Sequence, residues 1–200
     1  MKSLDDKYSY DILRKIYDYN MAVWKPINIF GIRNEADFKA DRFNDVIGIC
    51  GESTENKIIL FQATTDPGIK ATREHRTGAS HLIAGFYKDV WTIEYRKRFD
   101  CKVFVQVGKV STREDTNRDG IIQDSEPTST DMGPEWGIFL HPPIRINPDD
   151  IGDASWGCQV ARSRDEYLTS LLPACEASGM KKFSYLLVNK SEETDQYFTM

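Results

Sequence analysis

From residue 27 onward the sequence consists of short apolar runs separated by turn residues. Seven runs have strand character: 45–50 (DVIGIC), 57–64 (KIILFQAT), 81–87, 90–95 (VWTIEY), 102–111 (KVFVQVGKVS), 136–141 (WGIFLH) and 184–189 (SYLLVN). Many short strands at this spacing are typical of an antiparallel sandwich or barrel. The length of 200 residues suits one domain, and no run approaches the ~20 apolar residues of a membrane span. We therefore predict an α+β, predominantly β fold, with residues 27–200 as a single β-rich domain.

The N-terminal segment instead repeats its apolar residues at helical spacing. Within residues 5–24, one stripe collects Leu13, Ile16, Tyr17, Asn20 and Trp24. Asp5 and Asp6 favour the N-terminal end of such a helix through its dipole, and Pro26 ends it. We expect residues 1–26 to form a helix that packs on the core.

A second helix is expected after residue 163. Ser163 and Glu166 have the spacing of a capping box, in which each side chain satisfies a main-chain donor of the other residue. The apolar residues that follow at helical spacing are Tyr167, Leu168, Leu171 and Leu172. Pro173 is expected to end or kink this helix, and Gly179 is suited to stop it.

The charge of the chain argues against a general nucleic-acid binder, which is usually basic. The formal net charge is −5, from 26 Lys and Arg and 31 Asp and Glu. The charges are unevenly placed: residues 67–110 hold 9 basic against 4 acidic side chains, and residues 111–153 hold 3 against 10. An acidic block of this density requires a cation, a basic neighbour or open solvent.

Four cysteines stand far apart, at positions 50, 101, 158 and 175. They form no C-x-x-C pair and no Cys/His zinc pattern. The first residues, MKSLDDKYSYDILRK, are too polar for a signal peptide, so we expect synthesis in the cytoplasm and no disulfide framework. Cys50 and Cys101 lie in apolar runs and are predicted to be small core residues.

The acidic block contains the pattern of a calcium loop. Oxygen-bearing side chains occupy positions 1, 3, 5, 9 and 12 of residues 115–126, and Gly120 stands at position 6, where a sharp turn is needed. The expected ligands are Asp115, Asn117, Asp119, the Ile121 carbonyl, a water near Gln123 and a bidentate Glu126. The flanks do not favour helices, so we predict a structural Ca²⁺ loop between strands that would hold residues 136–141 in place. The alternative is a metal-free hairpin whose Asp, Asn and Gly residues make turns.

The second candidate site combines His141 with Cys158. His141 ends an apolar run, and Cys158 follows Ser155-Trp156-Gly157. Gly157 permits a tight turn before the cysteine, which exposes the sulfur and aims main-chain N–H groups at a developing oxyanion. His141 is then placed to act as the general base that generates the thiolate.

This pattern resembles the motif of YkuD-type L,D-transpeptidases, a histidine followed by Ser/Thr-His-Gly-Cys. In this chain, 13 residues separate His141 from Ser155-Trp156-Gly157-Cys158, and Trp156 replaces the second histidine of the family. The stretches ATTDPG (63–68) and GFY (85–87) are similar to two strands of that family. The resemblance covers about residues 45–175 and implies an L,D-transpeptidase-like β-sandwich or barrel.

The resemblance implies a cysteine enzyme that acts on peptidoglycan stem peptides, as a lytic L,D-carboxypeptidase or endopeptidase, or as a transpeptidase. Cys158 would be the nucleophile and His141 the base. Gly157 and Cys158 would supply oxyanion donors, and Ser155 would orient His141. Because stem peptides carry carboxylates, the candidate substrate-binding residues are Trp156, Arg145, Arg162 and His81, together with the basic segment 67–110. His81 also has a plainer interpretation, as a core or rim residue. The enzyme would reach the cell wall by release or delivery, for example by a bacteriophage.

Two other hypotheses compete with this one. In the first, the chain is a non-enzymatic, calcium-stabilised β module of a cell-wall or virion assembly, and Cys158 is an inert thiol. Thiol reactivity separates these hypotheses, because a catalytic cysteine is expected to have a lowered pKa and to alkylate quickly near neutral pH. The second, a papain-like protease, is disfavoured because the cysteine precedes the histidine in that family.

Overall fold

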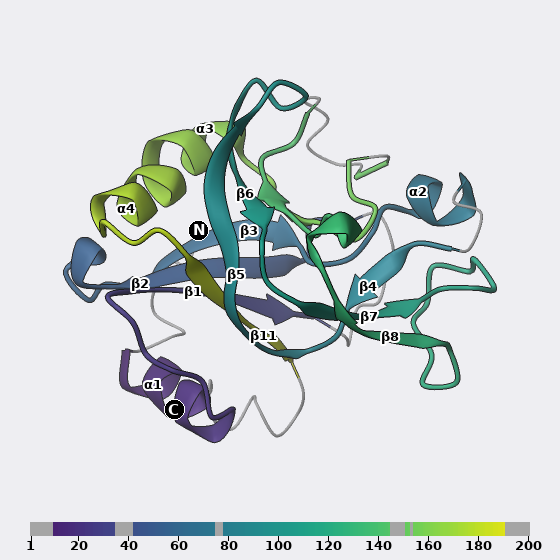
Figure 1. Ribbon diagram of the computed structural model, residues 1–200, viewed down its shortest axis with the longest axis horizontal. Helices are drawn as coiled ribbons and strands as arrows, with labels where there is room; N and C mark the ends of the chain where they lie inside the picture. The colour runs from purple at the N-terminus through teal and green to yellow at the C-terminus, as the bar shows by residue number, and fades with distance from the viewer. Residues whose placement is uncertain (1–9, 35–41, 75–77, 145–150, 153, 191–200) are drawn as a thin grey trace.

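The computed structural model describes residues 10–34, 42–74, 78–144, 151–152 and 154–190. Eight strands close into a barrel in the order β1-β11-β5-β6-β9-β10-β3-β2 (Figure 1). These strands are β1 (Ile27–Arg33), β2 (Asp45–Gly51), β3 (Ile59–Thr64), β5 (Gly85–Arg96), β6 (Cys101–Gln106), β9 (Leu140–His141), β10 (Gln159–Ala161) and β11 (Phe183–Asn189). The structure therefore agrees with the predicted mainly β fold, in its barrel form.

A smaller sheet and short helices surround the barrel. The sheet has the order β4-β7-β8, with β4 (Ser80–Leu82), β7 (Val110–Glu114) and β8 (Thr128–Met132). The helical segments are α1 (Tyr10–Tyr19), η3 (Glu52–Thr54), α2 (Ile69–Glu74), η4 (Pro134–Trp136), α3 (Arg164–Glu166), η5 (Tyr167–Leu171) and α4 (Leu172–Ala177). Within the described residues, none of these helices has the length and apolar character needed to cross a membrane.

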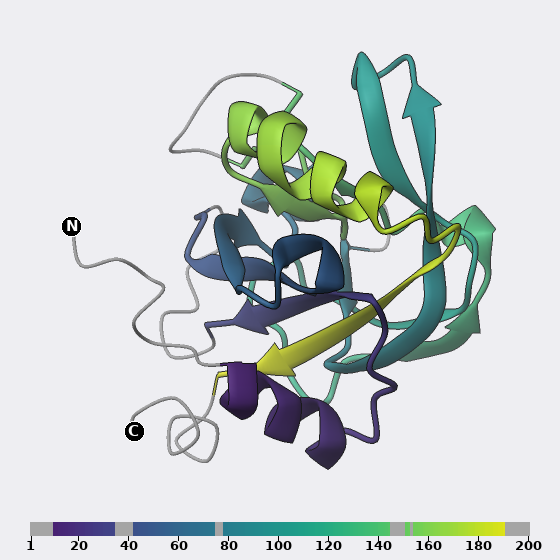
Figure 2. The same cartoon turned by 90° about the vertical axis from the view of Figure 1, so that its left-hand side faces the viewer.

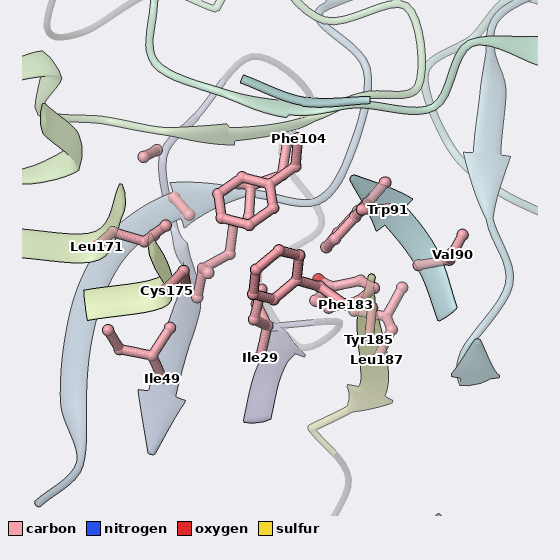
Figure 3. Close-up of a cluster of buried hydrophobic side chains, with 14 of the residues drawn as sticks. Ile29, Ile49, Val90, Trp91, Phe104, Leu171, Cys175, Phe183, Tyr185 and Leu187 are labelled. Atoms are coloured by element: carbon pink, nitrogen blue, oxygen red, sulfur yellow. The ribbon is translucent and has the colours of Figure 1, made fainter. Parts of the chain in front are cut away.

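Large aromatic and aliphatic side chains fill the barrel (Figure 3). Trp91, Phe104 and Phe183 are almost fully buried there, and Leu171 and Cys175 add to the same core from the C-terminal helices. Removing this apolar surface from water is the main stabilisation of the fold, at about 25 cal/mol per Å².

The N-terminal helix explains why β1 is buried on both faces. Helix α1 lies against the outside of the barrel (Figure 2). Its Leu13, Ile16 and Tyr17 pack against the outward side chains Phe30 and Ile32 of β1. The inward residues of β1 join the barrel core, so every residue of the strand is buried. The predicted stripe is therefore the packing face of α1, although the helix ends at Tyr19 and Trp24 packs beside it as a separate residue.

The barrel departs from the expected antiparallel pattern at two places. β1 pairs with β11 and β9 pairs with β10 in parallel. A parallel pair of strands requires a crossover connection of a dozen or more residues. For β9 and β10 this connection is residues 142–158, so the crossover itself returns the Ser155–Cys158 motif to the side of His141.

Several predicted boundaries also shift. The run 81–87 is divided between β4 and β5, and the run 102–111 is divided between β6 and β7. The run 136–141 is a strand only at Leu140–His141. β1, β8, β10 and α2 were not predicted as separate elements.

The second helix begins as predicted and continues further. The Ser163 side chain accepts a hydrogen bond from the Glu166 N–H, and Gly179 closes the helix with a φ of 68°. Pro173 does not end the helix: the turn before it widens into the π-helix η5, in which the Leu172 N–H bonds to the Tyr167 carbonyl oxygen, and the chain continues helical as α4.

Candidate functional site

Cys158 and His141 line one cavity of about 480 Å³ on the outside of the barrel. Leu140 pairs with Gln159 and His141 with Val160, so the two parallel strands hold the motifs side by side. Side chains alternate between the two faces of a strand, and Leu140 and Gln159 face the barrel interior, where Leu140 joins the core and Gln159 bonds to Tyr185. His141 and Cys158, their neighbours in sequence, therefore share the opposite, outer face. The structure places both residues on one cavity, and no hydrogen bond joins the Cys158 thiol to the His141 ring in this resting state.

The turn before Cys158 depends on glycine. Gly157 has a φ of 130°, and a Cβ at this position would lie 2.4 Å from the carbonyl oxygen of Ser80. The Ser155 hydroxyl donates to the Cys158 carbonyl oxygen at 2.8 Å and accepts from the Gly157 N–H at 3.3 Å. Ser155 therefore holds the turn, whereas we expected it to orient His141. Because the Gly157 N–H is used inside the turn, the Cys158 amide is the better candidate for an oxyanion donor.

His141 is held by its main chain and by an aromatic ring. Its Nδ1 lies 2.8 Å from the Pro142 carbonyl oxygen, which only a protonated Nδ1 satisfies. Nε2 of the neutral ring is therefore the proton acceptor. The ring stacks on Phe99, with 4.3 Å between centroids. Burial lowers the pKa of His141 to about 4, and the charge of Arg98 acts in the same direction, so the imidazole is neutral at pH 7.

Cys158 is half-buried, and its thiol is neutral at rest. Its Sγ lies 3.5 Å from both the Gly137 carbonyl oxygen and the Phe139 nitrogen. Burial raises the pKa of Cys158 to about 11, although the Phe139 N–H and Arg98 act in the opposite direction. This direction is opposite to the lowered thiol pKa expected of a cysteine that alkylates quickly. The resting pair is therefore a thiol and a neutral imidazole, not a thiolate and an imidazolium.

Gln159 supports the site from inside the barrel, and sequence reasoning missed this role. Its side chain accepts a hydrogen bond from the Tyr185 hydroxyl at 2.8 Å, and its Nε2 lies 3.4 Å from the carbonyl oxygens of Thr65 and Gly157. A Cβ at Gly31 would lie 1.9 Å from the Tyr185 hydroxyl oxygen, so glycine there makes room for this bond. A glutamine directly after the cysteine, where an apolar strand residue is expected, was the available signal.

The predicted substrate-binding residues separate in space. Trp156 lines the Cys158 cavity and is 43% exposed. Arg162 lies on the β3 side, where its guanidinium donates to Gln62 Oε1 at 2.6 Å. His81 is buried and lines a different cavity, of about 490 Å³. Arg145 lies outside the described residues. The basic segment 67–110 does reach the Cys158 cavity, through Arg96, Lys97 and Arg98.

A second buried polar cluster, which the sequence did not reveal, surrounds the TTDPG stretch. Arg33 lies 3.0 Å from Asp66, which also lies 3.2 Å from His81 Nδ1. Burial raises the pKa of Asp66, but Arg33 and His81 outweigh burial and the net pKa is lowered. Asp45 accepts from the Thr65 N–H and hydroxyl at 2.7 and 2.8 Å, and burial together with Asp66 raises its pKa to about 6.

The acidic loop connects β7 with β8 at the right-hand edge of Figure 1. Asp115 accepts from the N–H groups of Arg118 and Gly120, and Glu126 accepts from those of Thr116 and Gln123. Within the described residues, no three His, Cys, Asp or Glu side chains are arranged to hold a metal ion. Each carboxylate oxygen has a further lone pair beyond these bonds, so the loop keeps acceptor capacity for a cation.

All four cysteines are free, with Cys50 and Cys175 buried and Cys101 half-buried. Cys158 differs from them because it lines a cavity together with a histidine. No family model, no curated protein and no solved structure matches this chain.

Proposed function

We propose that this protein is a cysteine-dependent enzyme that hydrolyses stem-peptide bonds of peptidoglycan, in the manner of an L,D-carboxypeptidase or endopeptidase with a lytic role. The observation that carries the proposal is the cavity shared by Cys158 and His141, which two adjacent parallel strands hold on one face. The resemblance to YkuD-type enzymes supplies the substrate class and an L,D-transpeptidase-like arrangement. The site of action would be the cell wall, after release or delivery.

The protonation states favour a general-base mechanism. The neutral imidazole takes the thiol proton at Nε2 as Sγ attacks the substrate carbonyl carbon. The tetrahedral oxyanion is stabilised by a main-chain donor, for which the Cys158 amide is the candidate. His141 then returns the proton to the departing amine nitrogen as the C–N bond breaks, leaving a thioester on Cys158.

Water completes the reaction. It attacks the thioester carbonyl while His141 takes one of its protons. The C–S bond breaks, the acid leaves and the proton returns to the sulfur. If an amine of a second stem peptide replaces water, the same steps form a cross-link. The raised pKa keeps the Cys158 thiol protonated in the free protein, so this order requires bound substrate to assist the proton transfer.

The non-enzymatic β module is the second candidate. The observation that favours it is the raised pKa of Cys158, together with the main-chain contacts of its sulfur. An inert half-buried thiol would have the same properties. The cavity beside this thiol, with its histidine and exposed tryptophan, favours the enzyme.

Digestion of purified peptidoglycan tests the proposal. Wild type, Cys158→Ala and Cys101→Ala are incubated with the same material, and the products are read by mass spectrometry. Cys101 is half-buried and lies outside the cavity, so its substitution controls for the loss of a thiol. We expect wild type and Cys101→Ala to release D-Ala or cut cross-links, and Cys158→Ala to do neither while folding normally. Equal products from wild type and Cys158→Ala would overturn the mechanism.

A further inference from the structure

The turn between β5 and β6 forms a basic wall of the Cys158 cavity. These two strands extend as a hairpin at the top of Figure 1, and Arg96, Lys97, Arg98 and Phe99 from this hairpin line the cavity. Among the described residues that line it, three side chains are cationic and none is a carboxylate. The charge of this cavity wall is therefore complementary to an anionic ligand.

The three cations differ in what already neutralises them. Arg96 pairs with Glu94 at 2.9 Å and also lies over the Phe139 ring. Among the described residues, no carboxylate lies within ion-pair distance of Lys97 or Arg98. Arg98 lies against the Phe99 ring, which also stacks on His141. Its charge lowers the pKa values of both His141 and Cys158, so it acts directly on the two reacting groups.

We propose that Arg98, supported by Lys97, binds the free carboxylate of the residue that leaves with the amine, so that the preferred substrate is a peptide whose scissile bond precedes a C-terminal residue. This inference rests on the proposed function and narrows it to a carboxypeptidase. A terminal carboxylate lies only one residue beyond the scissile bond, about 3.8 Å between successive Cα atoms. A guanidinium matches a carboxylate with two parallel hydrogen bonds, which fixes both position and orientation.

Carboxylate binding also has a consequence for the base. In the free protein, the charge of Arg98 depresses the pKa of His141. A bound carboxylate offsets this charge, so the imidazole becomes a better proton acceptor when the correct substrate is in place. Peptides without the carboxylate would lose both the contact and this gain in basicity.

The test uses one stem tetrapeptide ending in D-Ala, with its C-terminal carboxylate either free or amidated. Binding is measured with Cys158→Ala protein by isothermal titration calorimetry, and kcat/KM is measured with protein that retains Cys158. Each is repeated with Arg98→Gln, Arg98→Lys and Lys109→Gln. Lys109 is the matched control, because it is exposed and lies beyond the other end of β6. Its substitution by Gln removes one positive charge, as Arg98→Gln does.

We expect the free acid to be preferred over the amide by roughly 10- to 100-fold in both measurements. Arg98→Gln should abolish this preference. It should also raise the pKa on the acidic side of the kcat/KM profile, because the Arg98 charge no longer lowers the pKa of His141. Arg98→Lys should keep part of the preference, because a lysine keeps the charge without the fork. Lys109→Gln should leave the preference intact.

Two results would overturn the subsite: equal binding of acid and amide, or an Arg98→Gln variant that weakens both ligands equally. The outcomes also separate this inference from the proposed function. If Cys158→Ala protein prefers the acid through Arg98 but protein that retains Cys158 cleaves nothing, the subsite is supported and the hydrolysis proposal fails. If both peptides are cleaved at the same rate, hydrolysis is supported and the subsite fails.

Discussion

Two buried polar clusters in this molecule contain a histidine and titratable partners, yet they are organised differently. Around Asp66, the Arg33 guanidinium bonds to the Thr65 hydroxyl, the Thr65 and Leu82 carbonyl oxygens and the Asp66 carboxylate. Around Cys158, the sulfur accepts a long hydrogen bond from the Phe139 N–H and donates one to the Gly137 carbonyl oxygen, and His141 bonds to the Pro142 carbonyl oxygen. The first cluster holds compensated charges, and the second holds neutral groups facing a cavity.

The difference shows which cluster is suited to chemistry. Charges that compensate one another in a buried site resist change, because breaking one bond leaves an uncompensated partner. Proton transfer from a neutral thiol to a neutral imidazole leaves the net charge unchanged but separates two charges, which a bound substrate has to stabilise. The Asp66 cluster therefore holds the end of β1 against Thr65, Asp66 and Leu82, and the Cys158 cluster remains available to a ligand.

The largest expected effect concerns His141. His141→Gln should lower kcat/KM for stem-peptide hydrolysis by roughly 10²- to 10⁴-fold, because the base that accepts the thiol proton is lost. Thermal stability should also fall, because His141 is buried and the variant loses its bond to Pro142 and its ring contact with Phe99, so activity is expressed per folded molecule. Kinetics and thermal unfolding are measured on the same preparation. Activity within tenfold of wild type in a folded variant would remove His141 from the mechanism.

The opposite pattern is expected at Arg33. Arg33→Met should lower the free energy of unfolding by about 3–5 kcal/mol, because Asp66 is left without its main counter-charge. Lys57→Met is the matched control: Lys57 and its partner Glu55 are both exposed, so solvent screens the pair and the free energy of unfolding should change little. Urea unfolding measures both. Similar losses in the two variants would contradict the structural role of the Asp66 cluster.

Asp45 should add a pH dependence to the same cluster. Its pKa is raised to about 6 in the folded protein, so the folded state holds a proton that the unfolded state releases near pH 3.8. The stability contributed by this proton is present below about pH 3.8 and is lost as the pH rises to about 6, by about 2–3 kcal/mol. Between pH 3.5 and 7, the free energy of unfolding of wild type, measured in urea, should fall by this amount relative to that of Asp45→Asn, which has no titrating group at this position. Parallel curves for the two proteins would refute the assignment.

Much of the fold followed from local sequence, and the missed strands are those whose pairing depends on distant parts of the chain. Runs such as 45–50 and 184–189 alternate or bury their side chains strongly, so their strand character is visible locally. β10 is only three residues long, and its pairing depends on a crossover that no local pattern encodes. β8 has exposed polar residues, since it forms the outer strand of the small sheet.

The candidate site was predictable where one motif carried the signal. Gly157 and Cys158 form a local turn, and the histidine precedes them at a suitable spacing. The positions of Arg98 and His81 were not predictable, because tertiary packing decides which cavity each side chain enters. The Arg33–Asp66 pair joins the last residue of β1 to the loop after β3, 33 positions along the chain, so composition alone offered no signal for it.

The smallest expected effect is that of calcium binding to the acidic loop, a third region beside the Asp66 and Cys158 clusters. Ile121, Ile122 and Asp124 line the cavity that also contains Arg33 and His81, so calcium there should act on stability and not on chemistry. With a Kd of 10⁻⁴–10⁻³ M, as in extracellular calcium modules, 1 mM Ca²⁺ would stabilise the fold by about 0.4–1.4 kcal/mol.

Thermal unfolding with 1 mM Ca²⁺, 1 mM Mg²⁺ or chelator measures this effect, in wild type and in Glu126→Gln. We expect a higher Tm with Ca²⁺ in wild type only, because the bidentate carboxylate is the ligand that favours Ca²⁺ over Mg²⁺. Turnover per folded molecule should be the same with calcium and with chelator. A Tm independent of calcium would identify the loop as a metal-free hairpin, in which the amide bonds to Asp115 and Glu126 are sufficient to hold its shape. A loss of turnover on chelation at constant Tm would instead show that the loop affects the chemistry at the Cys158 cavity. Calcium would then not act on stability alone.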